Sequence, residues 1–103
     1  MDEKAIDYII EKYPNRIPVI LYQTERFLRL HKLKKHKYLI HSETKVGLFL
    51  YQLKKINHIK TADSMFLLHN DTVINSGDTF GFLQVKFNEK ALILTVDVES
   101  AFG

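Results

Sequence analysis

The sequence predicts an α+β domain in which one amphipathic helix packs across one face of a four-stranded sheet. Two observations lead to this class: four short apolar runs have the composition of strands, and one longer segment places apolar residues at helical spacing. The chain has 103 residues, of which 46% are hydrophobic and 26% are charged. This balance suits one globular core and no second.

The first element is a helix over Asp2–Tyr13, because isoleucine and tyrosine recur there at i, i+3, i+4 and i+7. Asp2 is its expected N-cap, and Pro14 ends it. Since a stronger helix later in the chain takes one face of the sheet, we expect this first helix on the other face.

The middle of the chain reads as strand, strand, helix. Arg16–Tyr22 is short, apolar and β-branched, which predicts a buried strand, although Pro18 inside it would normally favour an edge strand or a bulge. His36–His41 is a second strand, reached through a basic stretch. Thr44–Ile56 is the clearest helix, with one apolar face made of Val46, Phe49, Leu50, Leu53 and Ile56.

The last third of the chain holds two more strands. Ser64–His69 is the third strand, and the Asn70-Asp71 pair after it signals a turn. Ala91–Val96 is the fourth strand and runs into a tail over 97–103. The pattern over Ser76–Phe87 is ambiguous, because its apolar spacing fits a helix while its two glycines also suit a hairpin arm.

Several kinds of chemistry have no support in the sequence. The chain has no cysteine, which excludes disulfides, thiol catalysis and Cys-ligated metal sites. The five histidines lack the spacing of a metal site, and no motif marks a nucleophile or a phosphate loop. No apolar run is long enough to span a bilayer, and no leader is evident. We therefore expect a cytoplasmic binding protein without a cofactor, rather than an enzyme.

The net charge of +3 is unevenly placed along the chain. Six cations fall within twelve residues that contain no acid: Arg26, Arg29, Lys32, Lys34, Lys35 and Lys37. Such a block can meet nucleic-acid phosphates, an anionic membrane or acidic peptides, or it can be a solvated edge. For nucleic acid, Tyr22, Phe27 and Tyr38 lie close enough in sequence to stack on bases.

The second predicted strand has two distinct faces. Alternation places Lys37 and Leu39 on one face, and Tyr38 and Ile40 on the other. At a sheet edge, such a strand offers unpaired backbone groups to an extended peptide, and its lysines would select a peptide that carries acids. The other interpretation is that these lysines only block edge-to-edge aggregation.

Five blocks of the sequence resemble a known family. Tyr13–Ile20 (Tyr-Pro-Asn-Arg-Ile-Pro-Val-Ile) is similar to the aromatic-Pro-x-Arg-Ile-Pro-Val-Ile signature of the autophagy ubiquitin-like modifiers, the GABARAP-like proteins. The remaining blocks resemble this family in the same order and with nearly the same spacing: 35–40, 46–51, 66–71 and Phe102-Gly103.

The resemblance implies a fold. It is a ubiquitin-like β-grasp that takes up residues 1–103 as a single domain, with an N-terminal helix over 1–13, a core over 14–96 and a flexible conjugation tail over 97–103. The family carries proline at the position of Pro18, so the strand tolerates it. The resemblance also favours a short helix within 76–87.

The resemblance further implies a protein tag. A glycine such as Gly103 has no side chain and unrestricted φ/ψ, which suits a carboxyl donor that must thread a narrow enzyme channel. An activating enzyme would adenylate Gly103 with ATP and pass it as a thioester to a conjugating enzyme. The final amide would join it to phosphatidylethanolamine on autophagosomal membrane, and a deconjugating cysteine protease would reverse the step. A cytoplasmic form and a membrane-attached form would then coexist.

The second implied function is capture of autophagy receptors and adaptors. Family members bind acidic aromatic-x-x-aliphatic peptides as an added β-strand. The positions that match the aromatic pocket are Ile9, Pro18, Ile20, Lys37 and Leu39. Those that match the aliphatic pocket are Tyr38, Ile40 and Phe49, while Arg16 and Lys35 would meet the flanking acids.

This sequence departs from the family at several positions. Ala91 stands where the family commonly has Phe, and His41, Thr44 and Gln52 make the aliphatic pocket more polar. We expect a divergent member without the further helix that the family carries before Asp2. Three other functions stay open: an unconjugated adaptor, a modifier of protein lysines, and a binder of nucleic acid or a membrane surface through the basic residues 26–37. Of these possible partners, we do not expect nucleic acid.

Overall fold

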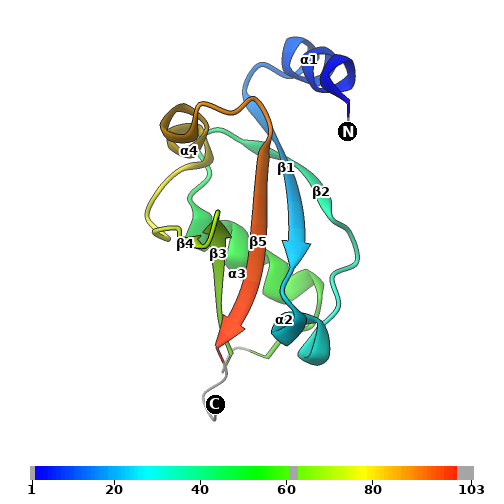
Figure 1. Cartoon of the computed structure of the whole chain (residues 1–103), viewed down its shortest axis with the longest axis vertical. Helices are drawn as coiled ribbons and strands as arrows, with labels where there is room; N and C mark the ends of the chain where they lie inside the picture. The colour runs from blue at the N-terminus through cyan, green and yellow to red at the C-terminus, as the bar shows by residue number, and fades with distance from the viewer. Residues whose placement is uncertain (1, 61–62, 100–103) are drawn as a thin grey trace.

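The computed structural model describes residues 2–60 and 63–99 and confirms the α+β class (Figure 1). Within these residues, a five-stranded sheet has the order β2-β1-β5-β3-β4, and helix α3 crosses one of its faces. The strands are β1 (Arg16–Gln23), β2 (Lys37–His41), β3 (Ser64–His69), β4 (Thr72–Val73) and β5 (Leu92–Glu99). The helices are α1 (Glu3–Lys12), α2 (Glu25–Leu30), α3 (Val46–Ile56) and α4 (Phe80–Phe87).

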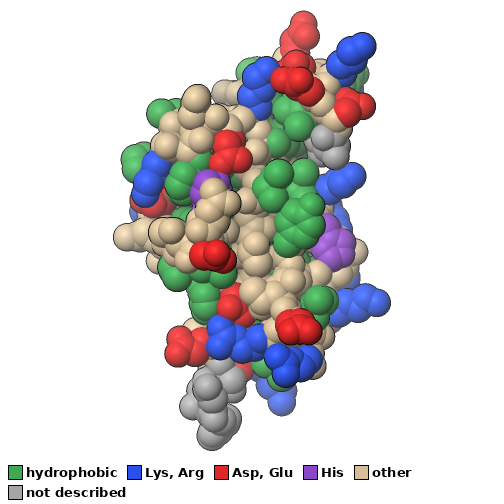
Figure 2. Space-filling view, viewed as in Figure 1, with side chains coloured by type: hydrophobic (Ala, Val, Ile, Leu, Met, Phe, Trp, Pro, Cys, Tyr) green, Lys and Arg blue, Asp and Glu red, His purple; other side chains and the backbone are tan. Residues whose placement is uncertain are grey.

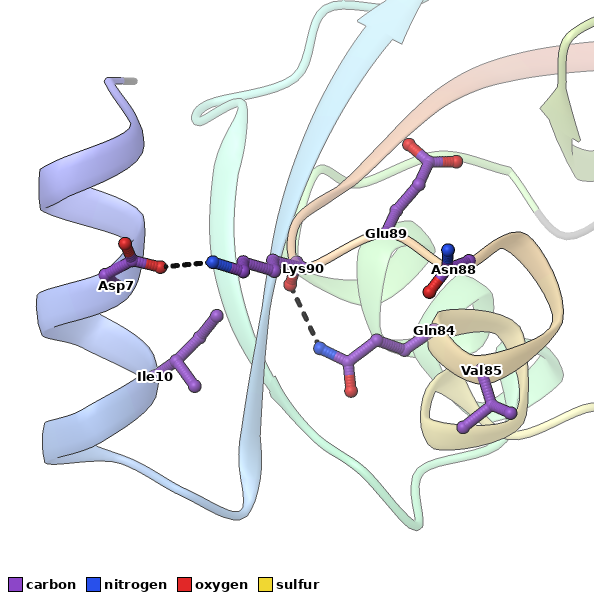
Figure 3. A pocket seen from close by; sticks show the side chains of 7 residues that line it. All are labelled: Asp7, Ile10, Gln84, Val85, Asn88, Glu89 and Lys90. Atoms are coloured by element: carbon purple, nitrogen blue, oxygen red, sulfur yellow. Dashed lines mark hydrogen bonds and ion pairs between the residues drawn. The ribbon is translucent and has the colours of Figure 1, made fainter.

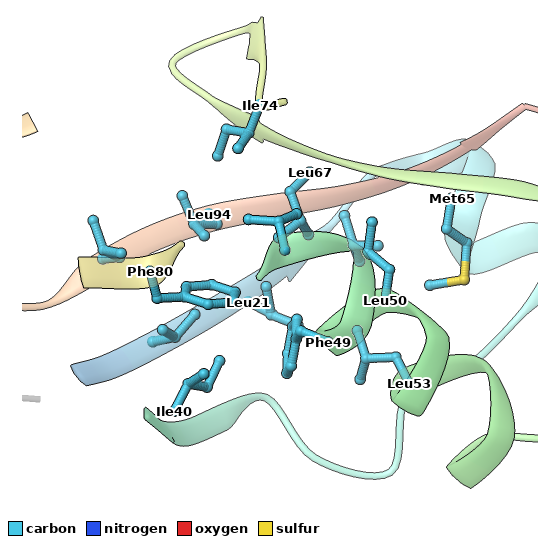
Figure 4. Close-up of a cluster of buried hydrophobic side chains, with 14 of the residues drawn as sticks. Leu21, Ile40, Phe49, Leu50, Leu53, Met65, Leu67, Ile74, Phe80 and Leu94 are labelled. Atoms are coloured by element: carbon cyan, nitrogen blue, oxygen red, sulfur yellow. The ribbon is translucent and has the colours of Figure 1, made fainter. Parts of the chain in front are cut away.

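The core lies between α3 and the sheet (Figure 4). Phe49 and Leu53 of α3 are buried there, and the ring of Phe49 meets the fully buried ring of Phe80 edge-on at 5.3 Å. Phe80 begins α4, whose N-cap Thr79 accepts a hydrogen bond from the Phe82 amide. The ambiguous segment therefore contributes a helix to the core, as the family resemblance implies, and not a hairpin arm.

The sheet has one strand more than the four that we expected. Asn70 and Asp71 adopt positive φ angles of 47° and 67°, which reverse the chain within two residues. The two residues of β4 then pair antiparallel with the end of β3. The turn signal predicts this reversal, but two residues are too few to form a recognisable strand pattern.

Pro18 lies in an inner strand, which confirms the predicted buried strand even though proline usually favours an edge strand or a bulge. β1 pairs antiparallel with β2, where Pro18 stands opposite Leu39, and it pairs parallel with β5 only from Val19 onward. In an antiparallel pair, every second residue of a strand bonds to the partner strand. The Leu21 amide donates to the His36 carbonyl at 2.8 Å, so the odd-numbered residues of β1 bond to β2 and Pro18 does not. The nitrogen of Pro18 therefore points toward the β5 side, before that pairing begins, where no donor is needed.

Helix α1 does not cover the other face of the sheet, as we had expected. It lies at one end, close to the start of β1, and none of its residues is buried (Figure 1). A tight turn, in which the Arg16 amide donates to the Tyr13 carbonyl at 3.0 Å, holds it there. The Lys90 ammonium reaches across to the Asp7 carboxylate at 2.9 Å (Figure 3).

Helix α2 was not predicted, because we treated this segment only as a basic connection. Thr24 is its N-cap, with a side chain that accepts from the Phe27 amide at 3.1 Å. Phe27 is fully buried and anchors the helix, which packs against β5. The Thr-Glu-Arg-Phe sequence is the signal that an N-cap analysis could have used.

Strand β5 continues to Glu99, so the expected tail is wrong for its first three residues. Residues 100–103, with Gly103, lie outside the described residues. Residues 97–99 pair antiparallel with the first three residues of β3, 64–66. Asp97, which is 8% exposed, also accepts from the Thr24 hydroxyl at 2.7 Å, from Arg26 Nη2 and Nε at 2.7 and 3.1 Å, and from the Val98 amide at 2.8 Å. We call this network the Asp97 clasp.

Asp97→Asn is expected to lower the free energy of unfolding by about 2–3 kcal/mol near neutral pH, since a buried charge-assisted network is broken. The Arg26 guanidinium, helped by Thr24 and the Val98 amide against the cost of burial, lowers the pKa of Asp97 from 3.8 to about 2. A lowered pKa stabilises the fold above pH 3.8, and this contribution is lost as the pH falls from 3.8 toward 2. Urea unfolding between pH 2 and 7 should therefore show the gap between wild type and variant closing at acid pH, whereas the exposed control Asp71→Asn should stay within about 0.5 kcal/mol throughout.

Candidate functional site

The outer edge of β2 is the first part of the site. β2 ends the described sheet, so its only strand partner among the described residues is β1. The bonds that flank the pairing, Leu21 amide to His36 carbonyl and Ser42 amide to Asn15 carbonyl, fix which backbone groups face inward. By alternation, the amides and carbonyls of Lys37 and Leu39 and the amide of His41 face outward. The carbonyl of His41 accepts instead from the Thr44 amide at 3.0 Å. The predicted edge strand is therefore confirmed, and Lys37 and Leu39 have both backbone groups available to an added strand.

A groove runs between β2 and α3 beside this edge. Its volume is about 280 Å³, and Phe49 forms its buried floor. Five residues predicted for peptide binding line it: Arg16, Tyr38, Leu39, Ile40 and Phe49. The other lining residues are His41, Thr44, Gln52, Leu53 and Ile56. His41, Thr44 and Gln52 were expected to make this pocket more polar. Leu53 and Ile56 were predicted only for the apolar face of the helix, and not for the site.

The aromatic and basic side chains of the groove are ordered by local contacts. Tyr38 meets Phe49 edge-on at 5.2 Å and donates its hydroxyl to the Lys35 carbonyl at 2.7 Å. Burial raises the pKa of Tyr38, so its hydroxyl stays protonated and neutral. The Lys35 ammonium lies 5.6 Å from the Tyr38 ring centroid, and Arg16 carries a second positive charge at the groove. The site therefore combines an apolar floor with cations at its rim.

The predicted aromatic pocket is only partly assembled. The strand register places Pro18 beside Leu39 and Ile20 beside Lys37 on the sheet face opposite α3. Ile9 lies on α1, partly buried at the end of the sheet. It does not line the groove, nor do Pro18, Ile20, Lys35 or Lys37.

The sheet face opposite α3 also carries a residue that the sequence analysis missed. Ile93 stands next to Ile20 in the parallel pairing and is 51% exposed. Hydrophobic side chains gather in the middle of this face (Figure 2). Only the pairing of β1 with β5, which are seventy residues apart in sequence, brings these two isoleucines together, so no local pattern could have shown it.

A larger hollow lies elsewhere, between α1 and α4 (Figure 3). It measures about 730 Å³ and is bridged by the exposed Asp7–Lys90 pair, with Ile10 facing into it. This hollow is the seam where α1 meets the rest of the molecule. Across residues 2–60 and 63–99, no three His, Cys, Asp or Glu side chains are grouped to hold a metal ion. None of the helices in that part of the chain is both long and apolar enough to cross a membrane.

Comparison with known proteins gives the fold a family. The family described as "Autophagy protein Atg8 ubiquitin like" matches residues 2–103. The crystal structure of Trypanosoma brucei ATG8 is similar, with a TM-score of 0.82 and 24% sequence identity over 97% of this chain and 87% of that chain. Plasmodium falciparum Atg8 in complex with a Plasmodium falciparum Atg3 peptide is also similar, with a TM-score of 0.73 and 26% identity over 94% of this chain and 87% of that chain.

These matches agree with the sequence blocks that resemble the autophagy modifiers. They confirm the ubiquitin-like α+β fold, with five strands in the sheet where four were expected. This chain therefore belongs to the Atg8 family of ubiquitin-like autophagy proteins.

Proposed function

We propose that this chain is a conjugated modifier that captures acidic aromatic-x-x-aliphatic peptides by strand addition. The observation that supports it best is the outer edge of β2 lying directly beside the groove under Tyr38 and Phe49. Edge and groove together provide the two things that an extended peptide needs: backbone hydrogen bonds and a pocket for a side chain.

The peptide would add next to β2 through the outward backbone groups of Lys37 and Leu39 and the amide of His41. Its aliphatic anchor would enter the groove and pack on Phe49, and its acids would meet Arg16 and Lys35. The aromatic anchor would lie toward Leu39 and Ile20, on the more open side of the strand. Two anchors and a few backbone bonds are consistent with micromolar affinity, about −8 kcal/mol.

The partners would be receptors and adaptors that carry this motif. The matched Plasmodium structure is of Atg8 in complex with an Atg3 peptide, so peptide capture is documented for one relative. We propose that the conjugating enzyme presents a peptide to the same edge of this chain.

Conjugation would proceed through Gly103. The chain would be the substrate of an activating enzyme that uses ATP, of the conjugating enzyme and of a deconjugating cysteine protease, and not itself an enzyme. It would need no cofactor of its own, and phosphatidylethanolamine would be its covalent lipid. Family membership supports this proposed reaction, which would give a cytoplasmic pool and a pool on autophagosomal membrane.

Lys37→Glu combined with Leu39→Ala is expected to weaken peptide binding at least tenfold while leaving the fold intact. Both side chains are exposed, Leu39 by 41%, so little core packing is lost. The change removes a cation and part of the apolar surface at the edge where the peptide would add. The measurement is fluorescence anisotropy of a labelled peptide with two acids before a Trp-x-x-Leu core.

The matched control is Lys86→Glu combined with Val85→Ala on the exposed side of α4, which makes the same charge reversal and a similar loss of apolar surface away from β2. It should bind the peptide like wild type. Equal affinity of all three proteins would contradict docking at β2.

The competing proposal of nucleic-acid binding through 26–37 loses two of its three stacking residues. Phe27 is fully buried, and Tyr38 is partly buried against Phe49. Tyr22, which is 60% exposed, is left to offer a face to a base.

A further inference from the structure

We propose that the end of the molecule that carries α2 is a docking surface for an anionic lipid bilayer. We call this end the basic pole and define it by the exposed cations Arg29, Lys32, Lys34, Lys55 and Lys60 together with Leu28 and Leu30. The inference goes beyond conjugation itself. It rests on the proposed function only in that a lipid on Gly103 would bring this end to the membrane.

Two contacts and one shared hollow bring the residues of the basic pole together from distant parts of the chain. The Lys34 amide donates to the Asn57 side chain at 2.9 Å, joining the segment after α2 to the end of α3. The His31 ring contacts the Asp63 carboxylate at 3.0 Å. Lys54, Lys55 and Lys60 line a hollow of about 370 Å³ at the same end of α3. Figure 2 shows Lys and Arg side chains gathered at this end of the molecule.

Two of the four acidic side chains near the basic pole are each engaged by a basic side chain. Asp63 contacts His31, and Asp97 is paired with Arg26 in the clasp. Glu25 and Glu99 are exposed. The exposed cations therefore outnumber the exposed acids, and the surface is complementary to an anionic leaflet.

Helix α2 presents this charge together with aliphatic side chains. Phe27 points into the core, so helical spacing places Arg29 on the opposite, outer side with a leucine on each flank. Leu28 and Leu30 are 54% and 53% exposed, although both are large apolar side chains. A helix that lies at a membrane interface binds lipid headgroups through its cations and buries apolar side chains at the boundary of the acyl chains. Arg29 and the two leucines of α2 provide this combination. Single-stranded nucleic acid would instead favour exposed aromatic rings, and the one on α2 is buried.

The point where the chain leaves β5 places this surface against the membrane. The Asp97 clasp and the bond from the Thr24 amide to the Val96 carbonyl at 3.2 Å fix α2 beside the end of β5 (Figure 1). Gly103 is four residues beyond Glu99, and four residues span at most about 14 Å. This distance is close to the Debye length of about 10 Å at 0.1 M salt, so a lipid on Gly103 would hold the cations within reach of the headgroup charge.

The test anchors the full chain chemically, so that its outcome does not depend on any conjugating enzyme. The chain has no cysteine, and Gly103→Cys therefore gives a single thiol for coupling to a maleimide-headgroup lipid. Hydrogen exchange is compared on vesicles of phosphatidylcholine alone and of phosphatidylcholine with 30% phosphatidylserine. We expect the amides of 24–34 to exchange at least fivefold more slowly on the anionic vesicles, since one cation near an anionic leaflet contributes about fivefold to partitioning.

Matched variants separate the basic pole from overall charge. Arg29→Gln, Lys32→Gln and Lys34→Gln together should abolish the slowing. Lys4→Gln, Lys12→Gln and Lys86→Gln remove the same charge from other exposed positions and should preserve it. Equal loss in both triple variants would reduce the effect to net charge and overturn the proposal.

A second pair of variants tests the aliphatic contribution. Leu28→Ser with Leu30→Ser should at least halve the slowing. Leu48→Ser with Val85→Ser changes two side chains that lie elsewhere and are 51% and 80% exposed, and it should leave the slowing unchanged.

Two further results would overturn the proposal. One is equal exchange on the two kinds of vesicle, and the other is loss of the slowing on adding a single-stranded oligonucleotide at equal phosphate concentration. The second result would assign the surface to nucleic acid. If conjugation through Gly103 fails while the slowing is seen, the docking surface stands without the proposed function.

Discussion

Replacing Phe49 by alanine is expected to lower the free energy of unfolding by about 3–5 kcal/mol. Phe49 is 5% exposed and meets two other rings edge-on, Tyr38 at 5.2 Å and Phe80 at 5.3 Å. Its loss removes the transfer energy of a buried ring and leaves a cavity between α3 and β2 that the rigid sheet cannot fill. Urea unfolding followed by circular dichroism measures the change, and a loss below about 1 kcal/mol would contradict the packing described here.

Phe49 also forms the floor of the groove, so its effect on peptide binding must be separated from its effect on folding. Phe80 provides the comparison, because it is fully buried in the same ring cluster but does not line the groove. Phe49→Leu and Phe80→Leu both keep an apolar side chain and should destabilise by similar, smaller amounts. Peptide affinity should fall only in Phe49→Leu, and an equal fall in both would assign the effect to global destabilisation.

Local periodicity was enough to predict much of this fold. α3, β1, β2 and β3 begin within two residues of their predicted positions, because each has its own hydrophobic pattern. The elements that were missed are short: six residues in α2 and two in β4. Their stability comes from a buried anchor, a capping residue or a turn, none of which produces a repeating pattern.

The end of β5 shows a different reason for failure. Asp97, Val98 and Glu99 read as polar tail in sequence, yet they form strand because they pair with the start of β3. The Asp97 side chain also bonds to Thr24 and Arg26. A buried carboxylate is stable only with partners, and those partners are more than seventy residues away in sequence. No reading of the last strand alone could have found them.

The candidate site was predictable to the extent that it is local. The alternation of Lys37, Tyr38, Leu39 and Ile40 gave the two faces of β2 correctly, and their burial in the structure follows it. The position of Ile9 was not predictable in this way, because it depends on where α1 rests against Lys90. That α3 and β2 together form the groove was predicted only from the family resemblance, which placed Phe49 in one pocket with Tyr38 and Ile40.

Deleting Gly103 is expected to abolish conjugation completely, which is the largest effect that we predict. The reaction would activate the carboxyl group of this residue, and a shortened chain would present the bulky Phe102 instead. Ala101→Gly changes a residue of the same tail but keeps the final glycine, and it should be conjugated like wild type. Gel shift and intact mass after reaction distinguish the three proteins, and conjugation of the deletion variant would contradict the role of Gly103.

The most direct measurement is the intact mass of the full chain after incubation with an activating enzyme, a conjugating enzyme, ATP and phosphatidylethanolamine liposomes. We predict a mass gain of one phosphatidylethanolamine less one water, dependent on ATP and absent after deletion of Gly103. A gain of a whole protein would show a protein lysine as the acceptor and contradict the lipid assignment. An unchanged mass, in a reaction where a competent relative is fully conjugated, would contradict the modifier function and leave a peptide-binding adaptor.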